Sequence, residues 1–135
     1  MIWLQLSSTQ AANAMNALQG ARVLLIEDDF LVALSIKQML EEIGCTVVGP
    51  YATAEQANEA LDGSDIDFGV LDINIRDGTS VPVANALRAR SRPFIFVTGY
   101  RSPNIMLPDD LRSAKRLSKP VNSKMLRTAL LDEMR

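Results

Sequence analysis

The sequence predicts an α/β fold: a doubly wound, five-stranded parallel sheet with helices on both faces. Along residues 21–135, apolar runs that suit buried strands alternate with segments of helical periodicity. Successive strand-then-helix units imply right-handed crossovers, which build a parallel sheet covered on both sides. The chain has 135 residues, of which 47% are hydrophobic, so it can bury one core and is too short for two ordinary domains.

The strands are expected where apolar residues run together. Residues 23–26 (VLLI) form a continuous apolar run, as in a strand that is buried on both faces. Later runs are interpreted in the same way, over residues 45–49, 67–72, 93–99 and 114–118.

Helices are expected between these strands, over residues 32–43, 53–61, 80–90 and 122–134. Apolar residues recur on one face of the first helix, which Gly44 closes. Thr53 and Gln56 match a capping box at the start of the second, and Pro82 stands near the start of the third. Residues 100–113 are interrupted by two prolines and are expected to form at best a short or irregular helix.

The first twenty residues differ from the rest because they contain no charged side chain. This shift in composition predicts an N-terminal extension over residues 1–20 and a folded domain over residues 21–135. Ala11, Met15 and Leu18 fall at helical spacing, so the extension is expected to be either a short helix or a disordered tail.

The charges are distributed unevenly along the chain. Residues 1–75 carry 2 basic and 11 acidic side chains (net −9) and residues 76–135 carry 12 and 5 (net +7), which together give −2. The basic half either docks an acidic partner or forms a solvated face. Its basic residues are not interleaved with aromatic ones, so DNA binding is not expected.

Other residue types exclude several classes of chemistry. The sequence has no histidine, which excludes histidine-based catalysis and argues against a zinc site. Its one cysteine, Cys45, is expected to be a small buried residue. No apolar run is long enough to span a bilayer and no secretory signal is recognisable, so a cytoplasmic protein without membrane contacts is expected.

Three successive carboxylates, Glu27, Asp28 and Asp29, follow the first predicted strand. Because they repel one another at neutral pH, either a solvated turn or a bound cation is needed to offset that cost. Successive side chains of an extended chain point to opposite sides, so Glu27 is expected to face away from Asp28 and Asp29 and is left out of the site.

Polar residues also end the other predicted strands. Asp72 ends the third, Thr98 ends the fourth, and Lys119 follows the fifth. Ligands of such sheets bind beyond the carboxyl ends of the strands, near the switch in strand order. Clustered carboxylates at this edge are hard oxygen ligands that suit Mg²⁺.

In this order and spacing, the acidic pair, the lone Asp, the Thr and the Lys-Pro dipeptide at residues 119–120 resemble the receiver domain of bacterial two-component response regulators. The resemblance covers residues 21–135 and implies a flavodoxin-like fold with strand order 2-1-3-4-5 and a cis bond before Pro120. It also implies the roles of the site residues: phosphoacceptor, Asp72; Mg²⁺ ligands, Asp28, Asp29, Asp72 and the backbone carbonyl of Asn74; phosphoryl contacts, Thr98 and Lys119.

The stretch PFIFVTGY, residues 93–100, resembles the PFxFATGY motif of the receiver subfamily called FAT GUY. Several residues depart from ordinary receivers. Gly78 lies fewer residues after the phosphoacceptor along the sequence than the glycine of many receivers does. Gly99 replaces the usual Ala or Ser after the Thr, and Arg116 stands where an aromatic residue is usual. Tyr100 is therefore a candidate for the missing switch residue, with Gly99 as a hinge and residues 100–113 as the moving part.

The resemblance implies a response regulator receiver, and the few residues after Lys119 lead us to expect one that stands alone. It would take a phosphoryl group onto Asp72, with Mg²⁺, from the phosphohistidine of a sensor histidine kinase or a histidine phosphotransfer protein. It would catalyse only its own phosphorylation and slow dephosphorylation, and would signal by protein contact, relay the phosphoryl group or act as a phosphate sink. Homodimerisation stays open.

Two other functions fit parts of the same pattern. A Mg²⁺-dependent phosphohydrolase that works through an aspartyl-phosphate would normally carry a second Asp two residues after the nucleophile, where this chain has Asn74. A receiver used only as a binding module would not need the complete set of site residues.

Overall fold

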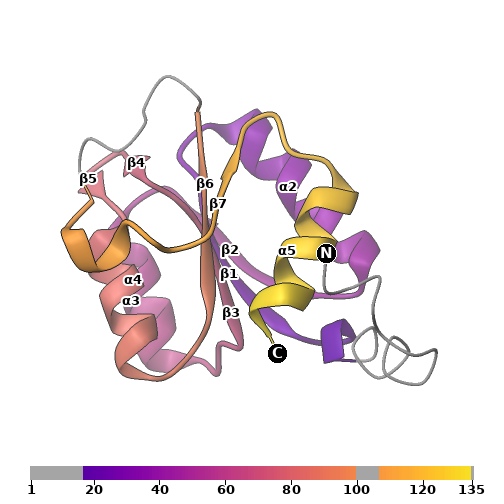
Figure 1. The fold of residues 1–135 in the computed structure, drawn as a ribbon, viewed down its shortest axis with the longest axis horizontal. Helices are drawn as coiled ribbons and strands as arrows, with labels where there is room; N and C mark the ends of the chain where they lie inside the picture. The colour runs from indigo at the N-terminus through magenta and orange to yellow at the C-terminus, as the bar shows by residue number, and fades with distance from the viewer. Residues whose placement is uncertain (1–16, 100–106, 135) are drawn as a thin grey trace.

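A five-stranded parallel sheet forms the centre of the computed structural model, which describes residues 17–99 and 107–134 (Figure 1). The strand order β2-β1-β3-β6-β7 confirms the predicted order, 2-1-3-4-5 in sequence terms. The strands are β1 (Arg22–Ile26), β2 (Thr46–Tyr51), β3 (Phe68–Asp72), β6 (Phe94–Thr98) and β7 (Arg116–Ser118).

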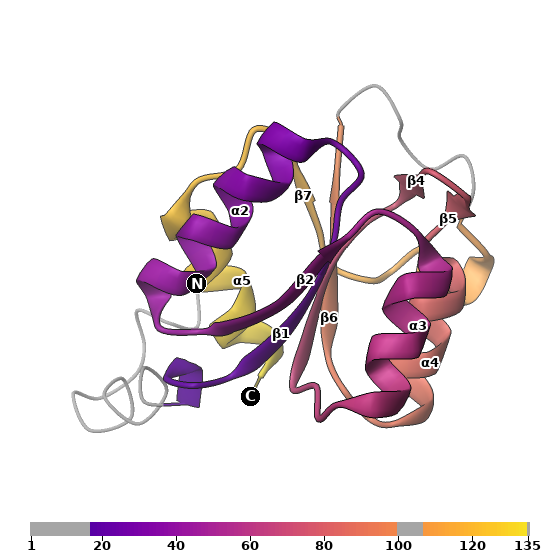
Figure 2. The ribbon, with the colours of Figure 1, turned by 180° about the vertical axis from the view of Figure 1, so that it is seen from behind.

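Helices cover both faces of this sheet. One face packs against α2 (Phe30–Ile43) and α5 (Ser123–Glu133), and the other against α3 (Ala54–Gly63) and α4 (Val81–Ala89), as Figures 1 and 2 show. None of the helices in the described part of the chain is long and apolar enough to cross a membrane.

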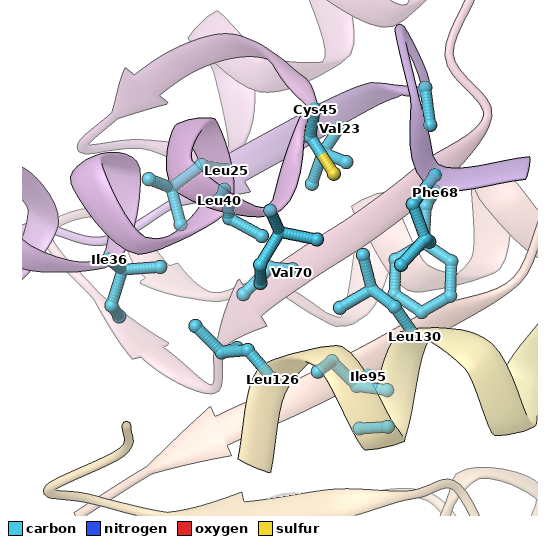
Figure 3. Packing of buried hydrophobic residues seen from close by; sticks show 14 of the residues in the cluster. Val23, Leu25, Ile36, Leu40, Cys45, Phe68, Val70, Ile95, Leu126 and Leu130 are labelled. Carbon is cyan, nitrogen blue, oxygen red and sulfur yellow. The ribbon is translucent and has the colours of Figure 1, made fainter. Parts of the chain in front are cut away.

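The sheet separates two hydrophobic clusters. Val23 and Leu25 of β1 lie in the cluster under α2 and α5, which Figure 3 shows, whereas Leu24 and Ile26 lie in the cluster under α3 and α4. This alternation explains why the strand is apolar at every position. Cys45 is buried in the first cluster, as predicted.

Local signals fix the helix ends. Gly44 ends α2 in the left-handed region with φ 110°, which favours glycine. The Thr53 hydroxyl accepts the Gln56 N–H at 3.1 Å and caps α3, and a proline opens α4. Residues 109–111 form the short 3-10 helix η2 (Asp109–Leu111), in line with the irregular segment expected there, whereas residues 100–106 lie outside the described part.

Two features were not predicted. Leu18 is fully buried in the first cluster and the Gly20 N–H donates to the Gly44 carbonyl at 2.8 Å, so residues 17–20 pack with the domain, while residues 1–16 lie outside the described part. A small antiparallel hairpin, β4 (Asn74–Ile75) and β5 (Gly78–Thr79), follows β3.

Candidate functional site

Three carboxylates meet at the carboxyl ends of β1 and β3. These two strands are neighbours in the sheet, with Ile26 opposite Leu71, so the residues that follow lie side by side. Ligand oxygens of Glu27, Asp28 and Asp72 all lie within 4.8 Å of one another, and both Glu27 and Asp72 are buried. Such a group concentrates negative charge in a place that water screens poorly.

Lys119 brings a positive charge to this group from the end of β7. Its Nζ donates to Asp72 Oδ2 at 3.2 Å and forms an ion pair with Glu27 Oε1. Its backbone N–H donates to the Thr98 carbonyl at 2.8 Å, which fixes the start of the segment after β7. The Lys119–Pro120 bond is cis, as predicted.

The expectation that Glu27 faces away from the site is wrong. Its Oε1 contacts Lys119, and its Oε2 accepts the Asp29 N–H at 3.2 Å. The alternation of side chains holds only within a strand, and β1 already ends at Ile26. Glu27 therefore turns into the cluster, together with Asp28 and Asp72.

Asp29 lies apart from that group. It is the N-cap of α2, and its Oδ1 accepts the N–H groups of Leu31 at 3.1 Å and Val32 at 3.2 Å. Its assignment as a Mg²⁺ ligand stays a prediction, but its carboxylate already accepts the hydrogen bonds that cap α2.

The remaining predicted residues lie around the cluster. Thr98 is buried at the end of β6, the strand beside β3, and its hydroxyl donates to the Gly99 carbonyl at 3.4 Å. Asn74 is exposed on β4, and Arg116 is half-buried opposite Phe96. Tyr100 lies outside the described residues.

The surroundings change the protonation of the site. Burial, and then the hydrogen bond and charge of Glu27, raise the pKa of Asp72 from 3.8 to about 7, although Lys119 acts in the opposite direction. Burial alone would lower the pKa of Lys119, but its contacts with Glu27 and Asp72 raise it. The ammonium therefore stays charged and only partly offsets three carboxylates.

This donor set suits a divalent cation. The three acids offer hard oxygen ligands, as Mg²⁺ requires, and among residues 17–99 and 107–134 the ion pairs of Lys119 leave an excess of negative charge there. Both the ligand type and the charge balance therefore fit the ion that the sequence predicts.

An apolar groove adjoins the cluster. It has a volume of about 390 Å³ and lies between the first turns of α2 and the Lys119–Pro120 segment. Next to it, Phe30, Leu31 and Leu34 of α2 are exposed, Phe30 to 76% and Leu31 to 73%. Exposed apolar residues grouped beside a reactive site are typical of a docking surface.

Known proteins share this architecture. Residues 23–131 match the family described as response regulator receiver domain. The solution structure of SdrG from Sphingomonas melonis Fr1 superposes with a TM-score of 0.76 at 32% identity, over 86% of this chain and 98% of that one. The BeF3-activated conformation of SdrG from Pseudomonas melonis Fr1 superposes with a TM-score of 0.70 at 33% identity, over 84% and 96% of the two chains.

Among curated proteins, the phyllosphere-induced regulator PhyR of Methylorubrum extorquens is 30% identical over 94 residues. The match covers 67% of this chain and 35% of PhyR, so the chain spans about a third of that relative's length. Because the family match extends over most of the fold described above, the chain belongs to the response regulator receiver domains, the phosphoacceptor signalling domains of two-component systems.

Proposed function

We propose that this chain accepts a phosphoryl group on Asp72 from a phosphohistidine of a sensor histidine kinase or a histidine phosphotransfer protein. The observation that carries the proposal is the position of the Asp72 carboxylate. It is buried among acids at the carboxyl end of the sheet and is held by Lys119 Nζ at 3.2 Å.

The transfer needs few groups from the chain. An Asp72 oxygen forms a bond to phosphorus while the phosphorus–nitrogen bond of the donor breaks, and the imidazole nitrogen keeps the electron pair and takes a proton from water. Lys119 offsets the charge that spreads over the phosphoryl oxygens. The Thr98 hydroxyl makes only a long hydrogen bond of 3.4 Å, so it can turn toward a phosphoryl oxygen instead.

Asp28, Asp72 and the backbone carbonyl of Asn74 are the proposed Mg²⁺ ligands. Glu27 offers an oxygen within 4.8 Å of those of Asp28 and Asp72, whereas the Asp29 carboxylate caps α2, so a variant of Asp29 tests whether it is also a ligand. The cation, when bound, neutralises charge at the phosphoryl group and favours the ionised carboxylate. Glu27 holds Lys119 beside the phosphoacceptor through their ion pair.

The exposed apolar side chains of α2 suggest how the donor approaches. Leu31 lines the groove together with Lys119 and Pro120. Phe30 and Leu34 are exposed on the same helix. We propose that an amphipathic helix of the donor packs here, which would bring a histidine on that helix to the mouth of the acidic cluster.

We also propose that the chain is a FAT GUY receiver, on the motif at residues 93–100. In that case Thr98, Gly99 and Tyr100 respond to the phosphoryl group, because Arg116 is half-buried and donates to the Arg112 carbonyl at 3.4 Å rather than acting as a buried aromatic switch. The output is protein contact, phosphoryl relay or a phosphate sink.

Mass spectrometry after incubation with acetyl phosphate and Mg²⁺ tests the proposal. We expect a single phosphoryl group on Asp72, absent in Asp72→Asn and retained in Asp62→Asn, a matched exposed aspartate on α3. Modification that persists in Asp72→Asn, or that does not need Mg²⁺, contradicts the assignment.

A further inference from the structure

The β4–β5 hairpin follows directly from the phosphoacceptor strand. Asn74 pairs with Thr79 and Ile75 with Gly78, which leaves Arg76 and Asp77 as the turn. Gly78 has φ 131°, a conformation that glycine adopts readily. A hairpin with so few pairs is not stable alone, so its position depends on contacts with the rest of the chain.

The Asp77 carboxylate supplies such a contact. Its Oδ1 accepts the Ala54 N–H at 2.9 Å and its Oδ2 accepts the Glu55 N–H at 3.3 Å, at the start of α3. These hydrogen bonds, led by that of Ala54, lower the pKa of Asp77. The next N–H, of Gln56, bonds to the Thr53 hydroxyl. Two separate residues thus cap one helix, and only Asp77 comes from another element.

Other contacts link the same two regions. The Arg76 N–H donates to the Ala52 carbonyl at 3.3 Å, just before α3. Ile75 is buried in the same cluster as Ala54 and Ala57. The hairpin is therefore fixed to the N-terminus of α3 through its turn and through its one buried side chain.

We propose that Asp77 is a positioning residue for the phosphorylation site. By binding the first N–H groups of α3, it holds the hairpin that begins with Asn74, and so holds the Asn74 carbonyl where a cation at Asp72 can use it. The inference rests on the proposed function, because it assumes that this carbonyl is a ligand. Residues that do not touch the metal but hold its ligands in place affect metal affinity strongly.

Calorimetric titration with Mg²⁺ of the wild type, Asp77→Ala and Thr53→Ala tests the proposal. Both variants lose a cap of α3, but only Asp77→Ala also removes hydrogen bonds between the helix and the hairpin. We expect Asp77→Ala to weaken Mg²⁺ binding by about ten-fold, and Thr53→Ala to bind as the wild type does. Asp77→Asn keeps a carbonyl oxygen for the Ala54 N–H without the charge, so its affinity should lie closer to wild type than that of Asp77→Ala.

Wild-type affinity in Asp77→Ala, or equal losses in Asp77→Ala and Thr53→Ala, would overturn the inference. Equal losses in Asp77→Ala and Asp77→Asn would also overturn it, because they would show an effect of charge alone. If the wild type still binds Mg²⁺ and accepts a phosphoryl group on Asp72, these results leave the proposed function standing. A wild type that binds no Mg²⁺ overturns both.

Discussion

Replacing Asp72 by Asn should stabilise the protein at neutral and alkaline pH when no divalent cation is present. The wild-type carboxylate is buried beside Glu27 and Asp28, and Lys119, with which it forms an ion pair, also pairs with Glu27. An asparagine has almost the same shape and carries no charge. The substitution therefore removes the repulsion and leaves the ion pair between Glu27 and Lys119 in place.

The size of this effect follows from the pKa of Asp72, which rises from 3.8 to about 7 on folding. Once the carboxyl is ionised in both states, that rise costs the folded protein about 4 kcal/mol, and screening by water at the mouth of the site reduces the figure to about 2 kcal/mol. The folded-state pKa is the higher one, so the wild type is unaffected below pH 3.8 and loses stability as the pH rises toward about 7.

Urea unfolding followed by circular dichroism, in EDTA, measures the difference at acidic and alkaline pH. The contributions of groups that titrate in both proteins cancel when the two free energies of unfolding are subtracted. The advantage of Asp72→Asn should therefore grow from near zero at about pH 4 to about 2 kcal/mol at about pH 8. Adding Mg²⁺ should stabilise the wild type more than Asp72→Asn. A difference that is independent of pH, or an Asp72→Asn protein that is less stable at alkaline pH, would refute the reasoning.

Further predictions concern neighbouring residues. Asp29→Ala should lower the free energy of unfolding by about 1 kcal/mol by removing the cap of α2, with unchanged Mg²⁺ affinity in calorimetry; the opposite pattern would make Asp29 a ligand. Glu27→Gln should lower the pKa of Asp72 in a carbon-13 NMR titration, because the Glu27 carboxylate raises that pKa; an unchanged value would contradict the contact. Leu31→Ser should slow transfer from a protein donor but not from acetyl phosphate, and equal slowing of both reactions would exclude a docking role.

Most strands of the sheet could be predicted because burial on both faces requires continuous apolar runs, whereas the strand order was implied by the resemblance to receiver domains. Along β1, alternate residues are buried in opposite hydrophobic clusters, so every position of the strand has to be apolar. The β4–β5 hairpin has no such apolar run, because only Ile75 of its residues is buried and its turn is polar. Leu18 falls at helical spacing with two other residues of the N-terminal segment, but that spacing does not show which surface the leucine packs against, so its burial in the domain was missed.

The site could be predicted at the level of strand ends and less well at the level of single side chains. Parallel topology brings Asp72 and Lys119 to one edge, and the structure joins them. Among the acids after β1, only the exclusion of Glu27 is wrong, since Glu27 lies in the cluster, whereas Asp29 caps α2, which begins at Phe30 and not at residue 32. An aspartate directly before a helix start is a preferred N-cap, and that signal would have separated Asp29 from Glu27 and Asp28.

The acidic cluster also links protonation to the proposed cation. A proton on Asp72 and a cation beside it relieve the same repulsion, so each must displace the other. Because the pKa of Asp72 is about 7, Mg²⁺ has to compete with a proton near neutral pH, and its affinity should fall as the pH drops below that value. The same proton would block attack on phosphorus, since only the ionised carboxylate is a nucleophile. The repulsion that weakens the folded protein is therefore the source of its affinity for the cation, and a variant stabilised by removing an acid should lose cation binding in return.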